Sequence, residues 1–275
     1  EHYRPESGEF PGAAVNTLLA TRDGGLWIGF SSGGASFLAA DGRLTNYGLE
    51  QGLPFGNIRD PAEDHDGTIW VAATGGLARL EGRRWRSVRM DWNYPCRSAW
   101  SLLVQDDGTL WVGAASPDKI LVLRKGTRAF RDTGLTLRVH TLAAAGETVF
   151  ANHDGGTVYQ MRRAADGSAA AARVFTRLPH GTVTIDPDGG LWVGGIQGLA
   201  RFRLDDPASG QPAGQPAVPS GDPSGERNAA AAELFTLESG LSGRRANEVL
   251  VDRERNIWVA TAGGLDRFRR RNLSW

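Results

Sequence analysis

Ten residues near predicted strand starts combine hydrogen-bonding and aromatic side chains, and together they could bind a ligand. A guanidinium presents a planar fork of donors to an oxyanion, and an aromatic ring offers a stacking surface to a sugar. We therefore predict a site for a small polar ligand, either a sugar or an organic anion. The alternative interpretation is that exposed loop arginines only solvate the surface. The residues are Asn57, Arg59, Trp92, Tyr94, Arg97, Trp100, Arg138, His140, Arg245 and Asn247.

The sequence has no comparable pattern for catalysis or metal binding. The acidic turns DHDG, QDDG and DPDG do not continue as a calcium loop, because the alternating ligands stop after two positions and no distal glutamate follows. His65 and His153 are single turn histidines without a second histidine at metal-ligand spacing. No Gly-x-Ser-x-Gly elbow is present, and the DGTIW spacing does not fit the sialidase box. We expect no catalytic residue, metal or cofactor in this chain.

A motif with a central aromatic residue recurs along the chain and indicates how the ten residues are positioned. Copies read GGLWIGFSSGGASFL from Gly24, DGTIWVAATGGLARL from Asp66 and GGLWVGGIQGLARFR from Gly189. A period near 40 residues is typical of a solenoid, an array or a propeller. The aromatic residues are Trp27, Trp70, Trp111, Phe150, Trp192 and Trp258, at intervals of 43, 41, 39, 42 and 66 residues.

Within one period the sequence predicts four short strands. The segments NIRDPAE, TIWVAA, LARLE and RWRSV, in residues 57–88, are separated by turns that contain Gly or Asp-Gly. No segment has a sustained helical period. Four antiparallel strands per period form one propeller blade. We predict an all-β fold, a β-propeller with six blades in this chain. Either the N-terminal segment EHYRP closes a ring of six blades, or a seventh native blade is missing.

The repeated aromatic residues are predicted to be scaffold. In the second strand of each blade, Trp and Gly or Ala point to one face, and the aliphatic residues point to the other. Blades stack face to face, so we expect the six aromatic residues to anchor neighbouring blades. We also expect the arginines of the GLAR and GLDR copies, Arg79, Arg201 and Arg267, to lie over aromatic rings.

The long last interval holds an insertion. Residues 205–232 are rich in Pro, Gly, Ala and Ser and poor in large apolar residues. We expect a flexible loop within the fifth blade of a single domain that spans residues 1–275. This loop and the Asp-Gly hairpins lie at one end of the blades, and the ten candidate residues lie at the linker end. Variable loops on a rigid scaffold often carry function.

Composition excludes several classes of partner. The chain has 31 basic and 31 acidic residues and a pI near 7.2, which argues against a nucleic-acid groove or an anionic membrane surface. The single cysteine, Cys96, excludes an internal disulfide. No apolar run is long enough to span a membrane, and no leader-like segment begins the chain. Because the first residue is Glu1 and not Met, we expect the chain to be part of a longer protein.

The tandem motif, together with the linkers NYGLEQGLPFGNI and FTLESGLSGRRANEVLVD, resembles the two-component regulator propeller repeat. The resemblance is strongest at residues 15–115 and 181–270. It implies the sensor propeller of a periplasmic receptor, anchored in the inner membrane and joined to a cytoplasmic histidine kinase; the alternative output is a diguanylate cyclase. It also implies a neighbouring propeller or immunoglobulin-like domain in the same chain and a homodimeric receptor. The fragment itself is expected not to be an enzyme.

Two other functions stay open. The DG-x-Leu/Ile-Trp repeat is also similar to that of virginiamycin B lyase, which implies a metal-assisted acid–base site. His140, His153 and Glu248 would be the candidates for such a site. A protein-interaction platform is the third reading, and it predicts a large apolar surface patch.

Overall fold

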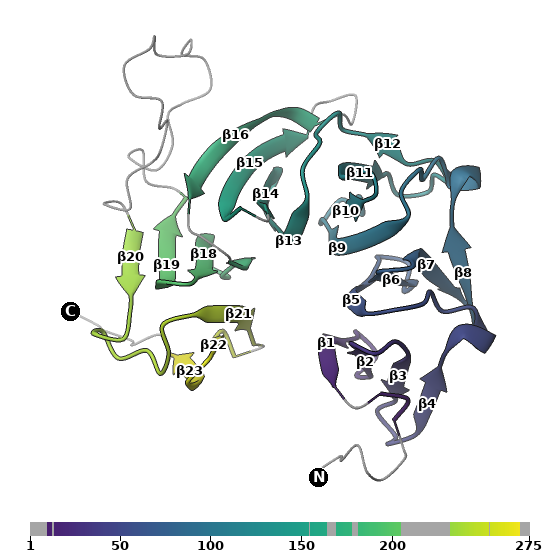
Figure 1. Ribbon diagram of the computed structural model, residues 1–275, viewed down its shortest axis with the longest axis horizontal. Coiled ribbons are helices and arrows are strands. Elements are labelled where there is room, and N and C mark those ends of the chain that lie inside the picture. The colour runs from purple at the N-terminus through teal and green to yellow at the C-terminus, as the bar shows by residue number, and fades with distance from the viewer. Residues whose placement is uncertain are drawn as a thin grey trace. The chain divides into compact units, whose positions relative to one another are not determined.

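The computed structural model describes residues 10–269, except positions 13, 154, 164–168, 178–180, 205–231 and 253. Its strands form six antiparallel sheets in which consecutive strands pair, and the fold is a β-propeller with six blades (Figure 1). The predicted fold class is therefore confirmed. The described residues also contain two 3-10 helices, η2 (Leu49–Gln51) and η3 (Met90–Trp92).

The chain divides into two compact units, and the first contains three blades. This unit comprises residues 1–139 and 164–169. Blade 1 consists of β1 (Val15–Ala20), β2 (Leu26–Phe30), β3 (Ala35–Leu38) and β4 (Leu44–Tyr47). Blade 2 consists of β5 (Ile58–Glu63), β6 (Ile69–Ala73), β7 (Gly76–Glu81) and β8 (Arg84–Val88). Blade 3 consists of β9 (Ser98–Val104), β10 (Leu110–Ala115), β11 (Lys119–Leu123) and β12 (Arg131–Asp132).

The second unit, residues 140–163 and 170–275, contains the other three blades. Blade 4 consists of β13 (Val139–Ala145), β14 (Thr148–His153), β15 (Thr157–Arg163) and β16 (Ala169–Arg177). Blade 5 consists of β17 (Val183–Ile185), β18 (Gly190–Gly195), β19 (Gly198–Arg203) and β20 (Ala232–Phe235). Blade 6 has three strands in the described residues, β21 (Ala246–Val251), β22 (Ile257–Thr261) and β23 (Gly264–Phe268).

Two predicted features fall outside the described residues. The segment EHYRP, Glu1–Pro5, belongs to the undescribed start of the chain. All but the last residue of the predicted 205–232 insertion is likewise undescribed, and the segment connects β19 to β20, the third and fourth strands of blade 5.

Four of the repeated aromatic residues, Trp27, Trp70, Phe150 and Trp192, pack in clusters that join two neighbouring sheets of one unit. Trp27 of blade 1 meets Trp85 of blade 2 edge to face at 5.4 Å between ring centroids, and Trp192 of blade 5 lies 5.8 Å from Phe268 of blade 6. Trp258, in the three-stranded blade 6, is only partly buried. The other five marker residues, Trp27, Trp70, Trp111, Phe150 and Trp192, are 0–4% exposed.

A side chain six residues earlier anchors four of the tryptophans. The indole N–H of Trp70 donates to Asp64 Oδ2 at 2.8 Å, and that of Trp192 donates to Asp186 Oδ2 at 2.9 Å. Trp258 and Trp111 use Asp252 and Gln105 in the same way. In blades 2, 5 and 6 the other oxygen of the aspartate accepts backbone N–H groups of the Asp-Gly-type hairpin. One carboxylate thus shapes the turn and positions the ring.

The arginines of the GLxR motif lie over the marker rings. The guanidinium carbon of Arg201 lies 5.5 Å from the ring centroid of Trp192, and Arg267 lies 5.2 Å from Trp258. Arg201 also donates through Nε and NH2 to Asp186 Oδ2, at 2.9 and 2.8 Å. Blade 3 has Gln105 in place of the aspartate and Val122 opposite Trp111 in place of the arginine. Blade 3 therefore has neither the aspartate nor the arginine of the ion pair.

A small residue in the second strand allows neighbouring blades to approach, and its enlargement should destabilise the fold. A Cβ on Gly29 would lie 2.6 Å from Ile58 Cγ2 of the next blade. We expect Gly29→Ala to lower the free energy of unfolding by about 1–3 kcal/mol, because the packed core has to shift. Denaturant unfolding followed by circular dichroism measures this. The matched control is Gly48→Ala, whose Cβ would meet nothing closer than 3.7 Å; an equal loss there would contradict the packing explanation.

Candidate functional site

A β-bulge occurs in the first strand of four blades, near the end that receives the linker from the previous blade. At each bulge the pairing with the second strand skips one residue. A bulge redirects the side chain of the extra residue and is common beside functional sites. The skipped residues are Asn16 in β1, Arg59 in β5, Trp100 in β9 and Asn247 in β21. Three of these four belong to the predicted site.

In the first unit, the bulges bring Arg59 and Trp100 into contact. The guanidinium carbon of Arg59 lies 3.7 Å from the centroid of the Trp100 ring. Arg138, just before β13, approaches the same ring at 5.8 Å, and its Nε lies 3.3 Å from Asp118 Oδ1. Two cations therefore meet one aromatic ring, and we call Arg59, Trp100 and Arg138 the bulge cluster.

The charge of Arg59 is not balanced by an ion pair in the described part of the chain. Its Nε is buried and has no hydrogen-bond partner there. Burial lowers the pKa of Arg59. An arginine nevertheless remains a cation at neutral pH. Asn57 Oδ1, at the approach to the same strand, is also buried and has no hydrogen-bond partner among the described residues. A buried donor without an acceptor costs free energy unless a ligand supplies one.

In the first unit, polar side chains at or directly after the bulges tie neighbouring blades together. Asp60 Oδ2 accepts a hydrogen bond from the Leu102 N–H at 2.8 Å and from Ser101 Oγ at 3.1 Å. The side-chain amide of Asn16 donates to the Ile58 carbonyl at 2.8 Å. These bonds fix β1, β5 and β9 side by side, so the spacing of Arg59 and Trp100 is set by the sheet framework and not by loops.

The second unit carries a related arrangement. Thr141 Oγ1 accepts from the Val183 N–H at 3.1 Å, and Thr182 Oγ1 donates to Glu248 Oε1 at 3.1 Å. Burial raises the pKa of Glu248, although hydrogen bonds from Thr182 and from the Val249 N–H oppose the rise. Glu248 as a whole residue keeps contact with solvent, so its carboxylate is crowded by protein and not sealed from water.

Three predicted site residues belong to this unit. His140 is partly buried in β13 and directly precedes Thr141, so it holds the place that Arg59 holds before Asp60. Asn247 is the exposed bulge residue of β21, and Arg245 is exposed just before that strand.

The linker DWNYPCR supplies no residue to the bulge cluster. Trp92 and Tyr94 belong to the apolar core of blades 2 and 3, at 9% and 1% exposed. The Tyr94 hydroxyl donates to the Ser98 carbonyl at 3.0 Å, and burial raises the pKa of Tyr94. Arg97 is exposed, and its backbone N–H donates to the Ser116 carbonyl. Trp92 and Tyr94 therefore lie in the packed core, which corrects the expectation that they join the other candidates at the linker end.

Sequence reasoning missed two contributors, Asn16 and Asp60. A signal for Asp60 existed, because the residue ten positions before the marker tryptophan is polar in five blades. These residues are Thr17, Asp60, Ser101, Thr182 and Glu248. Counting back from the repeat marker would therefore have indicated the inner polar positions.

The turn histidines have structural partners. His65 Nε2 lies 2.9 Å from the Gln105 carbonyl oxygen, and His153 Nδ1 accepts from the Gly155 N–H at 3.0 Å. Among the described residues, no group of three or more His, Cys, Asp or Glu gathers as metal ligands would.

Comparison with known proteins shows the fold. No family model and no curated protein matches the chain. The extracellular domain of the putative one component system BT4673 from B. thetaiotaomicron matches with a TM-score of 0.62 and 17% identity, over 94% of this chain and 39% of that chain. Virginiamycin B lyase from Staphylococcus aureus matches with a TM-score of 0.65 and 12% identity, over 94% of this chain and 85% of that chain. The gluconolactonase XC5397 from Xanthomonas campestris matches with a TM-score of 0.60 and 13% identity, over 94% of this chain and 86% of that chain.

The structural neighbours thus include an extracellular domain of a signalling system and two enzymes. The chain spans about two fifths of the BT4673 chain and most of each enzyme. No helix in the described ranges is long and apolar enough to cross a membrane.

Proposed function

We propose that this chain is the ligand-sensing propeller of a periplasmic receptor of the two-component regulator propeller family, and that it binds a small anionic or sugar-like ligand at the bulge cluster. The observation that carries the binding role is Arg59. Its guanidinium stacks on Trp100 at 3.7 Å, while its buried Nε has no acceptor among the described residues. A ligand oxygen would complete this hydrogen bond.

The framework around the cluster favours recognition over mere solvation. Asp60 and Asn16 hold the inner strands by hydrogen bonds, so the site is preorganised and loses little conformational entropy when a ligand binds. Arg138 is paired with Asp118, which leaves Arg59 as the cation that lacks an ion-pair partner in the described ranges. A carboxylate on a sugar ring would use both the cation and the aromatic face.

The receptor assignment is supported by the tandem repeat motif and by the likeness of fold to the extracellular BT4673 domain. Under this proposal the full protein continues into a membrane helix and a histidine kinase, or in the alternative a diguanylate cyclase. The open reading frame that encodes the chain tests this. A kinase or cyclase module downstream supports the proposal, and a stop codon directly after Trp275 contradicts it.

A propeller enzyme is the second candidate, and one observation favours it. Glu248 has a raised pKa and a hydroxyl partner in Thr182, which are properties of a general acid or base. Incubation of the chain with virginiamycin B or gluconolactone and Mg²⁺ tests this candidate. Turnover that is lost in Glu248→Gln would support the enzyme, and absence of turnover of both compounds would count against it.

Arg59→Ala should weaken ligand binding by about 10- to 100-fold, because a hydrogen bond to a charged group contributes about 1.5–3 kcal/mol. Isothermal titration calorimetry with glucuronate, and with glucose as the neutral counterpart, measures the affinity. The matched control is Arg43→Ala, an exposed arginine on the β3–β4 hairpin that pairs with Asp41. If Arg59→Ala folds normally and binds glucuronate as tightly as the wild type, the bulge cluster is not the site.

A further inference from the structure

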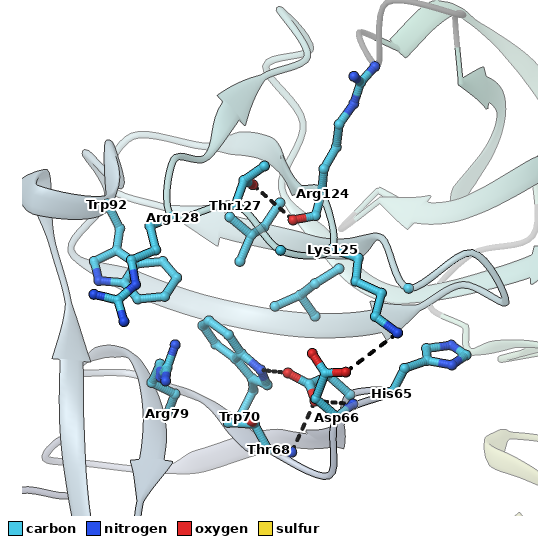
Figure 2. Close-up of a pocket in the computed structure, with 15 residues that line it drawn as sticks. His65, Asp66, Thr68, Trp70, Arg79, Trp92, Arg124, Lys125, Thr127 and Arg128 are labelled. Atoms are coloured by element: carbon cyan, nitrogen blue, oxygen red, sulfur yellow. Dashed lines mark hydrogen bonds and ion pairs between the residues drawn. The ribbon is translucent and has the colours of Figure 1, made fainter.

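A cavity lies between blades 2 and 3 of the first unit, at the opposite strand ends from the bulge cluster. Its volume is about 210 Å³, far more than the roughly 10–15 Å³ that one water molecule requires. The Asp-Gly hairpin between β5 and β6 lines one side, and residues 124–128 after β11 line the other (Figure 2). We call it the hairpin pocket.

Positive charge predominates in the hairpin pocket. Three cationic side chains face it, Arg79, Lys125 and Arg128, against the two carboxylates Asp64 and Asp66, while the Arg124 side chain points away (Figure 2). Asp64 accepts from the Trp70 indole and from two hairpin N–H groups. Asp66 pairs with Lys125 at 3.4 Å. Both carboxylates are therefore already engaged.

Arg128 approaches an aromatic ring and no carboxylate in the described part of the chain. Its guanidinium carbon lies 5.8 Å from the Trp92 ring centroid. Arg79 approaches the same ring at 5.0 Å, and Figure 2 shows both guanidinium groups directed toward one space beside Trp92. Two cations therefore face one space, and the ion pair of Arg79 with Glu81 balances only one of them.

Comparison with blade 5 shows that Arg79 lacks a hydrogen bond that its counterpart Arg201 makes. Arg79 and Arg201 stand at the same register, opposite Trp70 and Trp192. Arg201 donates through Nε to Asp186 at 2.9 Å. Arg79 has its NH2 3.2 Å from Glu81 Oε1, but its Nε is buried without a partner in the described residues. Blade 2 thus retains the aspartate and the arginine but leaves this donor without its acceptor.

We propose that the hairpin pocket binds a small oxyanion, either a phosphate or sulfate group or a carboxylate, between Arg79 and Arg128. The oxyanion supplies the acceptor that Arg79 Nε lacks and separates the two positive charges. Forked guanidinium donors suit such oxygens, and both guanidinium groups approach the Trp92 ring. This site does not depend on the proposed receptor function, because it shares no residue with the bulge cluster.

The test is titration calorimetry and thermal unfolding with sodium phosphate, sodium sulfate and sodium acetate, each against sodium chloride at equal ionic strength. We expect saturable binding of at least one oxyanion with a dissociation constant of about 1 mM or tighter, and a matching rise in melting temperature. The strongest of the three identifies the oxyanion class. No saturable heat and no melting shift beyond that of chloride with any of them would overturn the proposal.

Two variants locate the binding. Arg128→Ala removes an exposed side chain and should weaken binding at least tenfold without changing the unliganded melt. Arg79→Lys retains the charge but removes the Nε donor, and it should weaken binding similarly. Arg43→Ala, at an exposed arginine outside both proposed sites, should bind the oxyanion like the wild type. Equal oxyanion affinity in Arg128→Ala, Arg79→Lys and the wild type would overturn the proposal. An Arg59→Ala variant that binds glucuronate as tightly as the wild type would contradict only the receptor site at the bulge cluster.

Discussion

Asp186→Ala is expected to lower the free energy of unfolding by about 3–5 kcal/mol, because it removes the close ion pair of a largely buried arginine, Arg201, and leaves only the half-exposed Glu233 at 3.9 Å. Asp186 is 6% exposed and accepts from Arg201 at 2.8 and 2.9 Å, from the Trp192 indole at 2.9 Å and from the Gly190 N–H at 2.8 Å. One substitution therefore removes the turn acceptor, the ring acceptor and the ion pair together. Urea unfolding at pH 7 measures the loss.

The same carboxylate predicts a pH dependence. Burial alone would raise the pKa of Asp186, but hydrogen bonds from Gly190, Trp192 and Arg201, and the charge of Arg201, outweigh burial and hold it below its usual range. The folded state thus binds the proton less readily than the unfolded state. The stabilisation is complete above the unfolded pKa, about 3.9, and is lost as the pH falls through the lower folded value. The difference between wild type and Asp186→Ala should shrink when unfolding is measured at acid pH.

Blade 3 supplies the control for this prediction. There Gln105 accepts from the Trp111 indole at 2.6 Å, and Val122 stands opposite the ring. The double variant Asp186→Gln, Arg201→Val copies this neutral pair into blade 5. It should lose much less stability than Asp186→Ala, because replacing both partners of a buried pair is often nearly neutral. A double variant as unstable as the single one would show that the ion pair is not the cause.

The scaffold was predictable because its signals are local and repeated. A tryptophan beside Gly or Ala, and an Asp-Gly turn before it, specify one hairpin without knowledge of the rest of the chain. In blade 2 the four predicted strands coincide with β5 to β8. The end of the repeat is the weak point, since Trp258 is predicted as a buried anchor but is only partly buried in a blade with three described strands.

The site was only partly predictable because it depends on pairing between strands. The bulges that redirect Arg59 and Trp100 are shifts of register, which no single strand sequence encodes. Trp92 and Tyr94 lie in an irregular linker and therefore looked exposed, but Phe130, far along the chain, packs against Tyr94 at 5.5 Å. Long-range packing of this kind overrides the local appearance of a loop.

Trp111→Ala and Trp100→Ala should distinguish a scaffold residue from a ligand-binding residue. We expect the first variant to lose stability and the second to lose ligand affinity. Trp111 is 0% exposed, and its indole donates to Gln105, so its truncation should cost about 3–5 kcal/mol of unfolding free energy through the cavity left behind. Trp100 is a partly exposed bulge residue, and its truncation should change stability by about 1 kcal/mol or less. Urea unfolding of the two variants measures both values.

Ligand affinity should fall more in Trp100→Ala than in Trp111→Ala, the reverse of the order expected for stability. Trp100→Ala removes the ring on which Arg59 is stacked, so the guanidinium loses its orientation and glucuronate binding should fall at least tenfold in calorimetry. Trp111→Ala, measured at a temperature where it is still folded, should keep the affinity of the wild type. A Trp100→Ala protein that binds normally but unfolds as readily as Trp111→Ala would make Trp100 a scaffold residue. In that case the bulge would be a packing device, and the unpaired charge of Arg59 would need another explanation.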